Sequence, residues 1–255
     1  MKKYMMIMLA TMMVSSGFAK DDYKAKMDAF VSDLLGKMTV DEKIGQLNLT
    51  ICSEFVSGQI NDNSTTVRDN LKKGALGGLF GFKDAKQIKE LQKMAVENSR
   101  LHIPLIFGYD VVHGYDVTFP IPLALSSSWN PNIVETMARI SAKEAASDGV
   151  CWTYAPMVDI CHDARWGRIA EGAGEDPYLG SVMAKAYIHG FQGDNDLSKN
   201  TNIMACVKHF ALYGASEAGR DYNTVDMSRQ RAFNEYMMPY KAACDAGAGS
   251  FMASF

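Results

Sequence analysis

Apolar residues along this chain occur in two patterns that alternate from about residue 75 onward. Short continuous apolar runs, such as Ile203-Met-Ala-Cys-Val207, are typical of strands that are buried on both faces of a parallel sheet. Longer segments between them carry apolar residues at three- and four-residue steps, which predicts helices. The alternation predicts an α/β fold, either a doubly wound sheet or a (β/α)8 barrel of the TIM type.

The pattern predicts the following elements. Strands are expected at residues 75–80, 104–110, 150–158, 203–210 and 249–255. Helices are expected at residues 21–35, 39–49, 67–73, 84–98, 130–147, 177–190 and 228–246, and the polar residues 57–66 are expected to form a loop. Two helix starts have clear local signals, because Thr39 and Glu42 fit a capping box and Asn130 precedes a proline at the first helical position.

The two ends of the chain carry separate information. Residues 1–19 combine a Lys-Lys start, an uncharged apolar run too short to span a bilayer, and small residues at the cleavage spacing. This pattern predicts a signal peptide and a periplasmic or secreted protein. At the other end the chain stops at Phe255 inside an expected strand, and about five βα units do not close an eight-stranded barrel. We therefore expect residues 20–255 to be an incomplete N-terminal barrel domain.

Composition excludes several classes of function. The 255 residues carry a formal net charge of −3 and no basic run, so neither nucleic acid nor a membrane surface is expected as a partner. No strand is followed by Gly-x-Gly-x-x-Gly or by a Walker loop. The 5 cysteines are widely spaced, with no Cys-x-x-Cys and no Cys/His spacing that suits zinc. No metal and no cofactor are expected.

Polar residues stand at the carboxyl ends of the expected strands, where α/β proteins place their ligands. Asp110, Asp159, Lys208 and His209 occupy these ends. The loops behind them carry further candidates: His113, His162, Asp163, Arg165, Arg168, Glu171, Glu175, Arg220 and Asp221. Carboxylates that accept from hydroxyls, cations that donate to them and nearby aromatic rings suit a polyhydroxylated ligand.

Three details of these candidates predict local geometry. A lysine at the end of a buried apolar strand needs a ligand or a carboxylate partner, which singles out Lys208. Regular pleating would send Lys208 and His209 to opposite faces, so a shared site requires the backbone to leave regular strand geometry. Of Arg165 and Arg168, one is expected to brace the loop by pairing with Glu175 or Asp176, while the other faces the ligand.

Several motifs, in order along the chain, resemble those of the N-terminal barrel domain of family-three glycoside hydrolases, in particular the periplasmic β-glucosidase branch. The motifs are Met38-Thr-Val-Asp-Glu-Lys-Ile-Gly-Gln46, Gly108-Tyr-Asp-Val-Val-His-Gly114, Ala155-Pro-Met-Val-Asp159, Arg165-Trp-Gly-Arg168, Gly174-Glu-Asp-Pro177, Val207-Lys-His-Phe-Ala-Leu-Tyr-Gly214 and Tyr222-Asn-Thr-Val-Asp-Met-Ser228. They span nearly all of the chain after the first nineteen residues.

The resemblance implies a retaining hydrolase of terminal non-reducing β-D-glucosyl residues, acting on an oligosaccharide or an aryl or alkyl β-glucoside. It implies that Asp110, Arg168, Lys208 and His209 hold the terminal sugar, and that Phe255 lies near it. The family's nucleophilic aspartate would follow Phe255, and the acid/base of the glucosidase branch would lie in a second domain. No catalytic residue is therefore expected in this chain. The hexosaminidase branch has a histidine-rich loop after Lys-His-Phe, whereas residues 211–216 contain no histidine.

Two other functions remain open at this point. The chain could be a non-catalytic sugar-binding module. It could also be an aldolase-like barrel in which Lys208 forms a Schiff base from a barrel strand.

Overall fold

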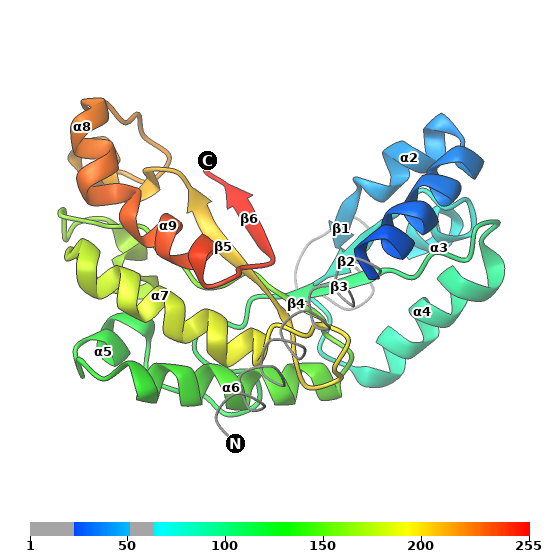
Figure 1. Ribbon diagram of the computed structural model, residues 1–255, viewed down its shortest axis with the longest axis horizontal. Helices are drawn as coiled ribbons and strands as arrows, with labels where there is room; N and C mark the ends of the chain where they lie inside the picture. The colour runs from blue at the N-terminus through cyan, green and yellow to red at the C-terminus, as the bar shows by residue number, and fades with distance from the viewer. Residues whose placement is uncertain (1–22, 52–63) are drawn as a thin grey trace, which may run out of the picture.

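The computed structural model describes residues 23–51 and 64–255. The predicted signal peptide, Cys52 and most of the predicted loop at residues 57–66 lie outside the described residues. The described strands form one six-stranded sheet in which every neighbouring pair is parallel and the order is β1-β2-β3-β4-β5-β6. A doubly wound sheet reverses its strand order at a switch point, and this sheet does not. The sheet therefore belongs to the barrel type, with helices along its outer side (Figure 1).

Five of the six strands were predicted, and each of them is shorter in the structure than the sequence predicted. The strands are β1 (Leu49–Ile51), β2 (Gly78–Phe80), β3 (Ile106–Tyr109), β4 (Trp152–Thr153), β5 (Met204–Phe210) and β6 (Ser250–Ala253). The prediction that a helix runs on to residue 49 is wrong, because it ends at Gln46 and β1 follows. The run Leu49–Ile51 is too short to be recognised alone, and it becomes a strand by pairing with Gly78–Phe80.

The helices alternate with the strands as expected, with one unpredicted addition. They cover residues 23–37, then α2 (Val40–Gln46), α3 (Ser64–Lys72), α4 (Ala85–Asn98), α5 (Pro122–Ser126), α6 (Pro131–Ser147), α7 (Pro177–Gln192), α8 (Arg229–Arg231) and α9 (Met238–Asp245). The sequence did not predict α5, which begins at Pro122 in a long loop. Both helix-start predictions are confirmed, since Thr39 and Glu42 form the capping box and the Asn130 side chain caps α6. None of the described helices is long and apolar enough to cross a membrane.

The single helix predicted over residues 228–246 is interrupted. A turn of π-helix, η5 (Ala232–Tyr236), separates α8 from α9, and the Met237 amide donates to the Ala232 carbonyl five residues back. Pro239 has no amide hydrogen and cannot continue the regular pattern of bonds to the fourth residue before it. The wider turn accommodates this break in the hydrogen-bonding pattern.

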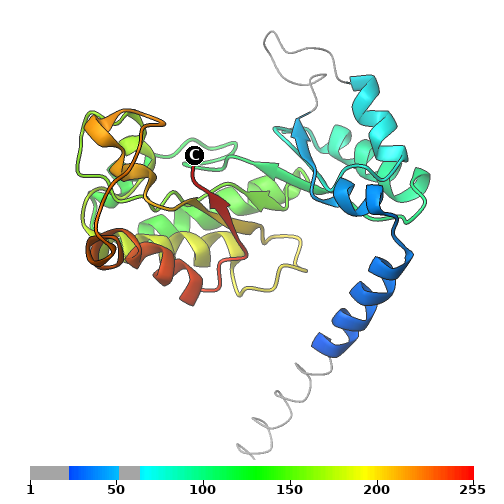
Figure 2. The same ribbon diagram turned by 90° about the horizontal axis from the view of Figure 1, so that it is seen from above.

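The helix over residues 23–37 projects from the body of the domain (Figure 2). The sequence predicted a helix here from its apolar spacing, and that prediction is confirmed. Its large apolar side chains are nevertheless exposed, with Tyr23 at 72% and Phe30 at 66% of full exposure. The apolar stripe therefore does not pack on the described part of the chain.

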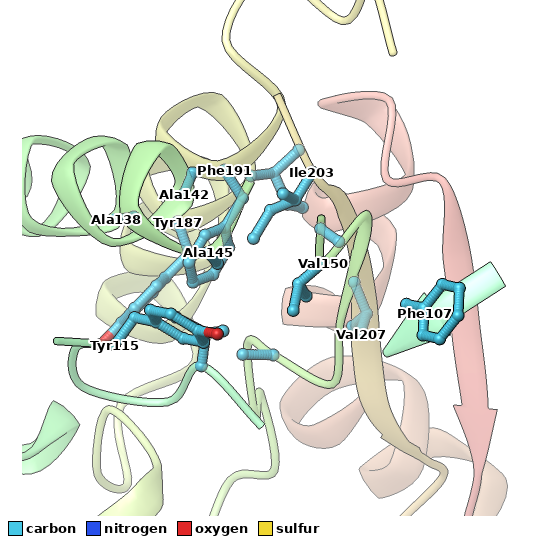
Figure 3. Packing of buried hydrophobic residues seen from close by; sticks show 14 of the residues in the cluster. Phe107, Tyr115, Ala138, Ala142, Ala145, Val150, Tyr187, Phe191, Ile203 and Val207 are labelled. Atoms are coloured by element: carbon cyan, nitrogen blue, oxygen red, sulfur yellow. The ribbon is translucent and has the colours of Figure 1, made fainter. Parts of the chain in front are cut away.

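The main core lies where α6 and α7 pack against the sheet. Figure 3 shows Ala138 and Ala142 of α6 facing Tyr187 and Phe191 of α7. These four side chains are buried. Small residues on α6 let α7 approach closely and place its aromatic rings over the strands. This packing fixes the position of the loop that precedes α7.

Replacing Gly190 with alanine is expected to lower the free energy of unfolding by about 1–2 kcal/mol. A Cβ at this position would lie 2.4 Å from the Ala138 Cβ and 2.6 Å from the Glu135 carbonyl oxygen, so α6 and α7 would have to separate. The overpacking outweighs the higher helix propensity of alanine. Urea denaturation measures the change.

The matched control is Gly36→Ala, at a helical glycine where a Cβ would meet no atom within 4 Å. This change should leave stability unchanged or raise it slightly. Equal effects of the two substitutions would contradict the close packing of α6 on α7.

Candidate functional site

The carboxyl ends of the strands surround a cavity of about 420 Å³. Asp110 follows β3, Lys208 and His209 belong to β5, and Arg168 lies in the 3₁₀ turn η2 (Gly167–Glu171). All four side chains line this cavity. Phe255, which follows β6, lines it as well. The structure thus brings together the four residues that the sequence singled out as sugar contacts.

Lys208 and His209 reach the cavity through an irregular stretch of β5. The pairing of β5 with β6 shifts register between Val207 and Phe210, and the Lys208–His209 peptide is cis. Adjacent residues of a regular strand would face opposite sides of the sheet. The predicted departure from regular geometry is therefore present, and both side chains line the same cavity.

Lys208 is buried and lies between two carboxylates. Its side chain is only 4% exposed, and its Nζ donates to Asp110 Oδ1 over 3.0 Å. Glu171 Oε2 lies 3.8 Å from the same nitrogen. The Asp110 side chain is 58% exposed, so its free oxygen can accept from a ligand. The sequence predicted that a lysine at this strand end needs a ligand or a carboxylate partner, and Asp110 is that carboxylate.

Arg168 is held by Glu171 in a two-pronged ion pair. Arg168 Nε donates to Glu171 Oε1 over 2.7 Å, and its Nη2 donates to Oε2 over 2.8 Å. These bonds raise the pKa of the Arg168 guanidinium. Desolvation opposes ionisation of Glu171, but the hydrogen bonds and charge of Arg168, with the charge of Lys208, outweigh it and lower the pKa of that carboxyl. Glu171 is therefore ionised at neutral pH.

His209 is fixed from behind by Asp159. Asp159 Oδ2 accepts from the His209 backbone amide over 3.0 Å and lies 2.8 Å from its Nδ1. Its Oδ1 accepts from the Tyr240 hydroxyl over 2.7 Å. Because Asp159 engages Nδ1 of His209, Nε2 is the ring nitrogen left for a ligand. Asp159 is 2% exposed and does not line the cavity, so it supports the site from below.

Aromatic rings border the cavity on the side of η3 (Tyr213–Ala215). The Phe255 ring lies 5.4 Å from that of His209 and 5.1 Å from that of Tyr213, and the Arg168 guanidinium lies 5.5 Å from the Tyr213 ring. Asp221 accepts from the Tyr213 hydroxyl and from the Trp166 indole, which anchors the loop after β5 to the loop after β4. Burial and the bond to Asp221 raise the pKa of Tyr213 to about 12, so the phenol stays neutral.

The prediction that Glu175 or Asp176 braces an arginine is wrong. Arg165 instead pairs with Asp163 through a bond of 2.6 Å from Nη2, and this arginine lowers the pKa of Asp163 to about 2. Asp176 caps α7 by accepting from the Leu179 amide over 2.6 Å. A carboxylate directly before Pro177 is placed to satisfy the helix start, which leaves it unavailable to Arg165.

The remaining loop candidates do not line the cavity. His113 Nδ1 bonds the Phe119 carbonyl oxygen, and His162 lies between Glu175 and Glu235 at 3.6 and 3.4 Å. Arg220 is exposed. Within residues 23–51 and 64–255, no three His, Cys, Asp or Glu side chains converge to hold a metal ion, and Cys151, Cys161, Cys206 and Cys244 are free thiols.

Sequence reasoning missed how Glu171 and Asp159 contribute to the site. It named both as candidates but assigned neither a partner. A signal for Glu171 existed, because Arg168 and Glu171 are three residues apart and such a pair can meet within a single helical turn. The bond from the Tyr240 hydroxyl to Asp159 joins residues 81 positions apart in the sequence, so no local sequence pattern predicts it.

The chain is similar in sequence to known proteins over most of its length. Residues 39–255 match the model of the glycosyl hydrolase family 3 N-terminal domain. The chain is 50% identical over 227 residues to the periplasmic beta-glucosidase of Salmonella typhimurium, covering 89% of this chain and 29% of that protein. It is 32% identical over 239 residues to a putative beta-xylosidase of Formosa agariphila, covering 87% of this chain and 32% of that one.

Solved structures agree in fold. The beta-glucosidase of Listeria innocua in complex with glucose superimposes with a TM-score of 0.81 at 40% identity, covering 89% of this chain and 32% of that one. A mutant of the same enzyme was solved with laminaribiose at the same TM-score. The chain therefore spans less than a third of the length of the first of these relatives and about a third of the others.

Proposed function

This chain belongs to glycosyl hydrolase family 3, and on that premise we propose that it forms the sugar-binding part of a β-glucosidase-like hydrolase that removes terminal non-reducing β-D-glucosyl residues. The observation that carries the proposal is that Asp110, Arg168, Lys208 and His209 line one cavity. The related proteins solved with glucose and with laminaribiose give independent support for a sugar ligand.

The chemistry of each side chain fits a neutral polyhydroxylated ring. The free oxygen of Asp110 accepts from sugar hydroxyls, and the Lys208 ammonium beside it donates to the same hydroxyls. Arg168 and Nε2 of His209 contribute further polar contacts from the neighbouring wall. Trp152 and Phe255 supply aromatic surface for the apolar face of the ring.

The bond-breaking carboxylates are proposed to come from sequence beyond Phe255. Retaining hydrolysis needs one carboxylate free to attack the anomeric carbon and a second carboxyl group to protonate the leaving oxygen. The carboxylates described here have other partners. Glu171 is tied to Arg168, Asp159 accepts from three donors, and Asp110 is paired with Lys208. This is consistent with the small share of its relatives that the chain spans.

The cellular setting is proposed from two observations. Residues 1–19 have a signal-peptide pattern, and a related protein of Salmonella typhimurium is a periplasmic beta-glucosidase. We propose that residues 20–255 are exported and belong to the barrel domain of a periplasmic or secreted enzyme whose second domain completes the site. Its substrate would be an oligosaccharide or an aryl or alkyl β-glucoside.

The aldolase-like alternative receives less support. A lysine that forms a Schiff base is activated in an apolar pocket or beside another cation. Lys208 Nζ is instead engaged by Asp110 at 3.0 Å, with Glu171 at 3.8 Å. A non-catalytic sugar-binding module would use the same cavity, and hydrolysis by the protein that contains this chain would separate the two.

The purified 255-residue chain is expected to bind glucose but to release no nitrophenol from p-nitrophenyl β-D-glucoside. Quenching of tryptophan fluorescence reports binding because Trp152 lines the cavity. Asp110→Ala should weaken binding by roughly tenfold or more, the worth of a charge-assisted hydrogen bond. The matched control is Asp116→Ala, at an exposed aspartate paired with Lys83.

Two results would contradict the proposal. Failure of the wild-type chain to bind glucose would remove the sugar-binding function. Steady release of nitrophenol, at a rate that scales with the concentration of the chain, would show that the catalytic carboxylates lie within these residues after all.

A further inference from the structure

The charged groups in and beside the cavity balance one another: Arg168, Lys208 and Asp110 line it, and Glu171 adjoins it through its ion pair with Arg168. Two cations, Arg168 and Lys208, face two carboxylates, Asp110 and Glu171, and each cation lies within 3.0 Å of a carboxylate oxygen. The carboxylate of Asp159 lies beneath them and is bonded to the His209 ring and amide. The Asp159 side chain is fully buried, so the four groups that can meet a ligand, Arg168, Lys208, Asp110 and Glu171, leave no surplus of either charge.

Glu171 is the member of this set that is least available to a ligand. Both of its oxygens accept from Arg168, at 2.7 and 2.8 Å, and Oε2 also lies 3.8 Å from Lys208 Nζ. Its side chain is 29% exposed, against 58% for Asp110. Glu171 thus occupies the two-pronged face of the guanidinium that would otherwise pair with an incoming carboxylate, sulfate or phosphate.

We propose that Glu171 is a specificity-determining residue that keeps the cavity neutral, so that the site selects uncharged sugars over sugars bearing an anionic substituent. The inference rests on the proposed sugar-binding function. An anionic ligand entering the cavity must displace Glu171 from Arg168 or accept repulsion from Glu171 and Asp110, whereas a neutral sugar meets no such cost. With Glu171 neutralised, Arg168 and Lys208 leave a surplus positive charge that attracts an anion.

The test compares two probes of similar shape, methyl β-D-glucoside and methyl β-D-glucuronide, with glucose 3-sulfate as an anion placed elsewhere on the ring. Dissociation constants are measured by tryptophan fluorescence with the wild-type chain and with Glu171→Gln. The wild-type chain should bind the neutral glucoside at least about tenfold more tightly than either anion. Glu171→Gln should reduce that preference by about tenfold or reverse it, and anion binding to the variant should weaken as salt is added.

Two further variants separate charge from position. Glu171→Asp keeps the negative charge but shortens the side chain, so it should keep the preference for the neutral probe even where overall affinity falls. Glu135→Gln makes the same change of charge at an exposed position on α6 and should leave the ratio of the constants as in the wild-type chain. If Glu171→Gln fails to fold, the ratio of the wild-type dissociation constants for the neutral and anionic probes still tests the inference.

The outcomes distinguish this inference from the proposed function. Binding of the neutral probe with an unchanged preference in Glu171→Gln would overturn the role of Glu171 alone. Equal affinities of the wild-type chain for neutral and anionic probes would also overturn it alone. Failure of the wild-type chain to bind any of the three probes would overturn the proposed function and this inference with it.

Discussion

Replacing Asp159 with alanine is expected to lower the free energy of unfolding by about 3 kcal/mol. Asp159 is 2% exposed and accepts from the His209 amide, the His209 ring and the Tyr240 hydroxyl. His209 and Tyr240 are themselves 1% and 2% exposed, so water cannot replace the lost acceptor without opening the core. The His209 amide and ring lose their acceptor and add a desolvation cost, whereas the Tyr240 hydroxyl keeps the His209 carbonyl oxygen at 2.6 Å. The loss of two buried bonds makes this the largest stability effect expected at the site. Guanidinium denaturation measures it.

Two control variants test whether the loss of stability comes from the acceptor that Asp159 provides. Asp159→Asn keeps one oxygen acceptor but turns an amide group toward donors, so its loss should be smaller than that of the alanine variant. Asp226→Ala removes a carboxylate from an exposed position and should change stability by less than about 0.5 kcal/mol. A loss below about 1 kcal/mol for Asp159→Ala would contradict a structural role for this carboxylate.

The sequence predicted the class of fold because the signals are local and repeated. Continuous apolar strand patterns separated by helical ones indicate a parallel α/β sheet, and cap residues such as Thr39 and Asn130 determine helix starts within a few residues. Besides α5, two elements escaped prediction for physical reasons. The strand Leu49–Ile51 depends on its neighbour β2, and the π-helical turn depends on how α8 and α9 accommodate Pro239.

The sequence predicted those residues of the candidate site that stand at the carboxyl ends of strands. Asp110 and Lys208 stand at the ends of apolar runs, so the edge of the sheet brings them to one place. Interactions across loops were not predictable in this way. Arg165 pairs with Asp163 because a neighbour two residues away is geometrically accessible, while Asp176 caps α7 and Glu171 pairs with Arg168. Pairing within a charged loop requires coordinates, since several combinations have similar spacing.

Lys208→Met is expected to weaken glucose binding by roughly 30-fold or more while leaving the free energy of unfolding within about 1 kcal/mol of the wild-type value. The Lys208 side chain is 4% exposed, so methionine of similar length fills the same space and removes a desolvated charge. Its two carboxylate neighbours tolerate the loss. Asp110 is 58% exposed and can be hydrated, and Glu171 keeps its two bonds to Arg168.

Binding should fall because the ammonium is the donor that shares ligand hydroxyls with Asp110, and a thioether cannot replace it. Fluorescence titration with glucose and urea denaturation on the same preparations provide the two measurements. Lys93→Met, at a 68% exposed lysine on α4, is the matched control and should change neither quantity. A variant that loses several kcal/mol of stability but binds glucose normally would mean that Lys208 is a structural ion-pair partner and does not contact the ligand. Loss of binding in a chain of unchanged stability is the signature of a residue retained for the ligand, because a buried lysine that served only the fold could be replaced by an apolar side chain at little cost.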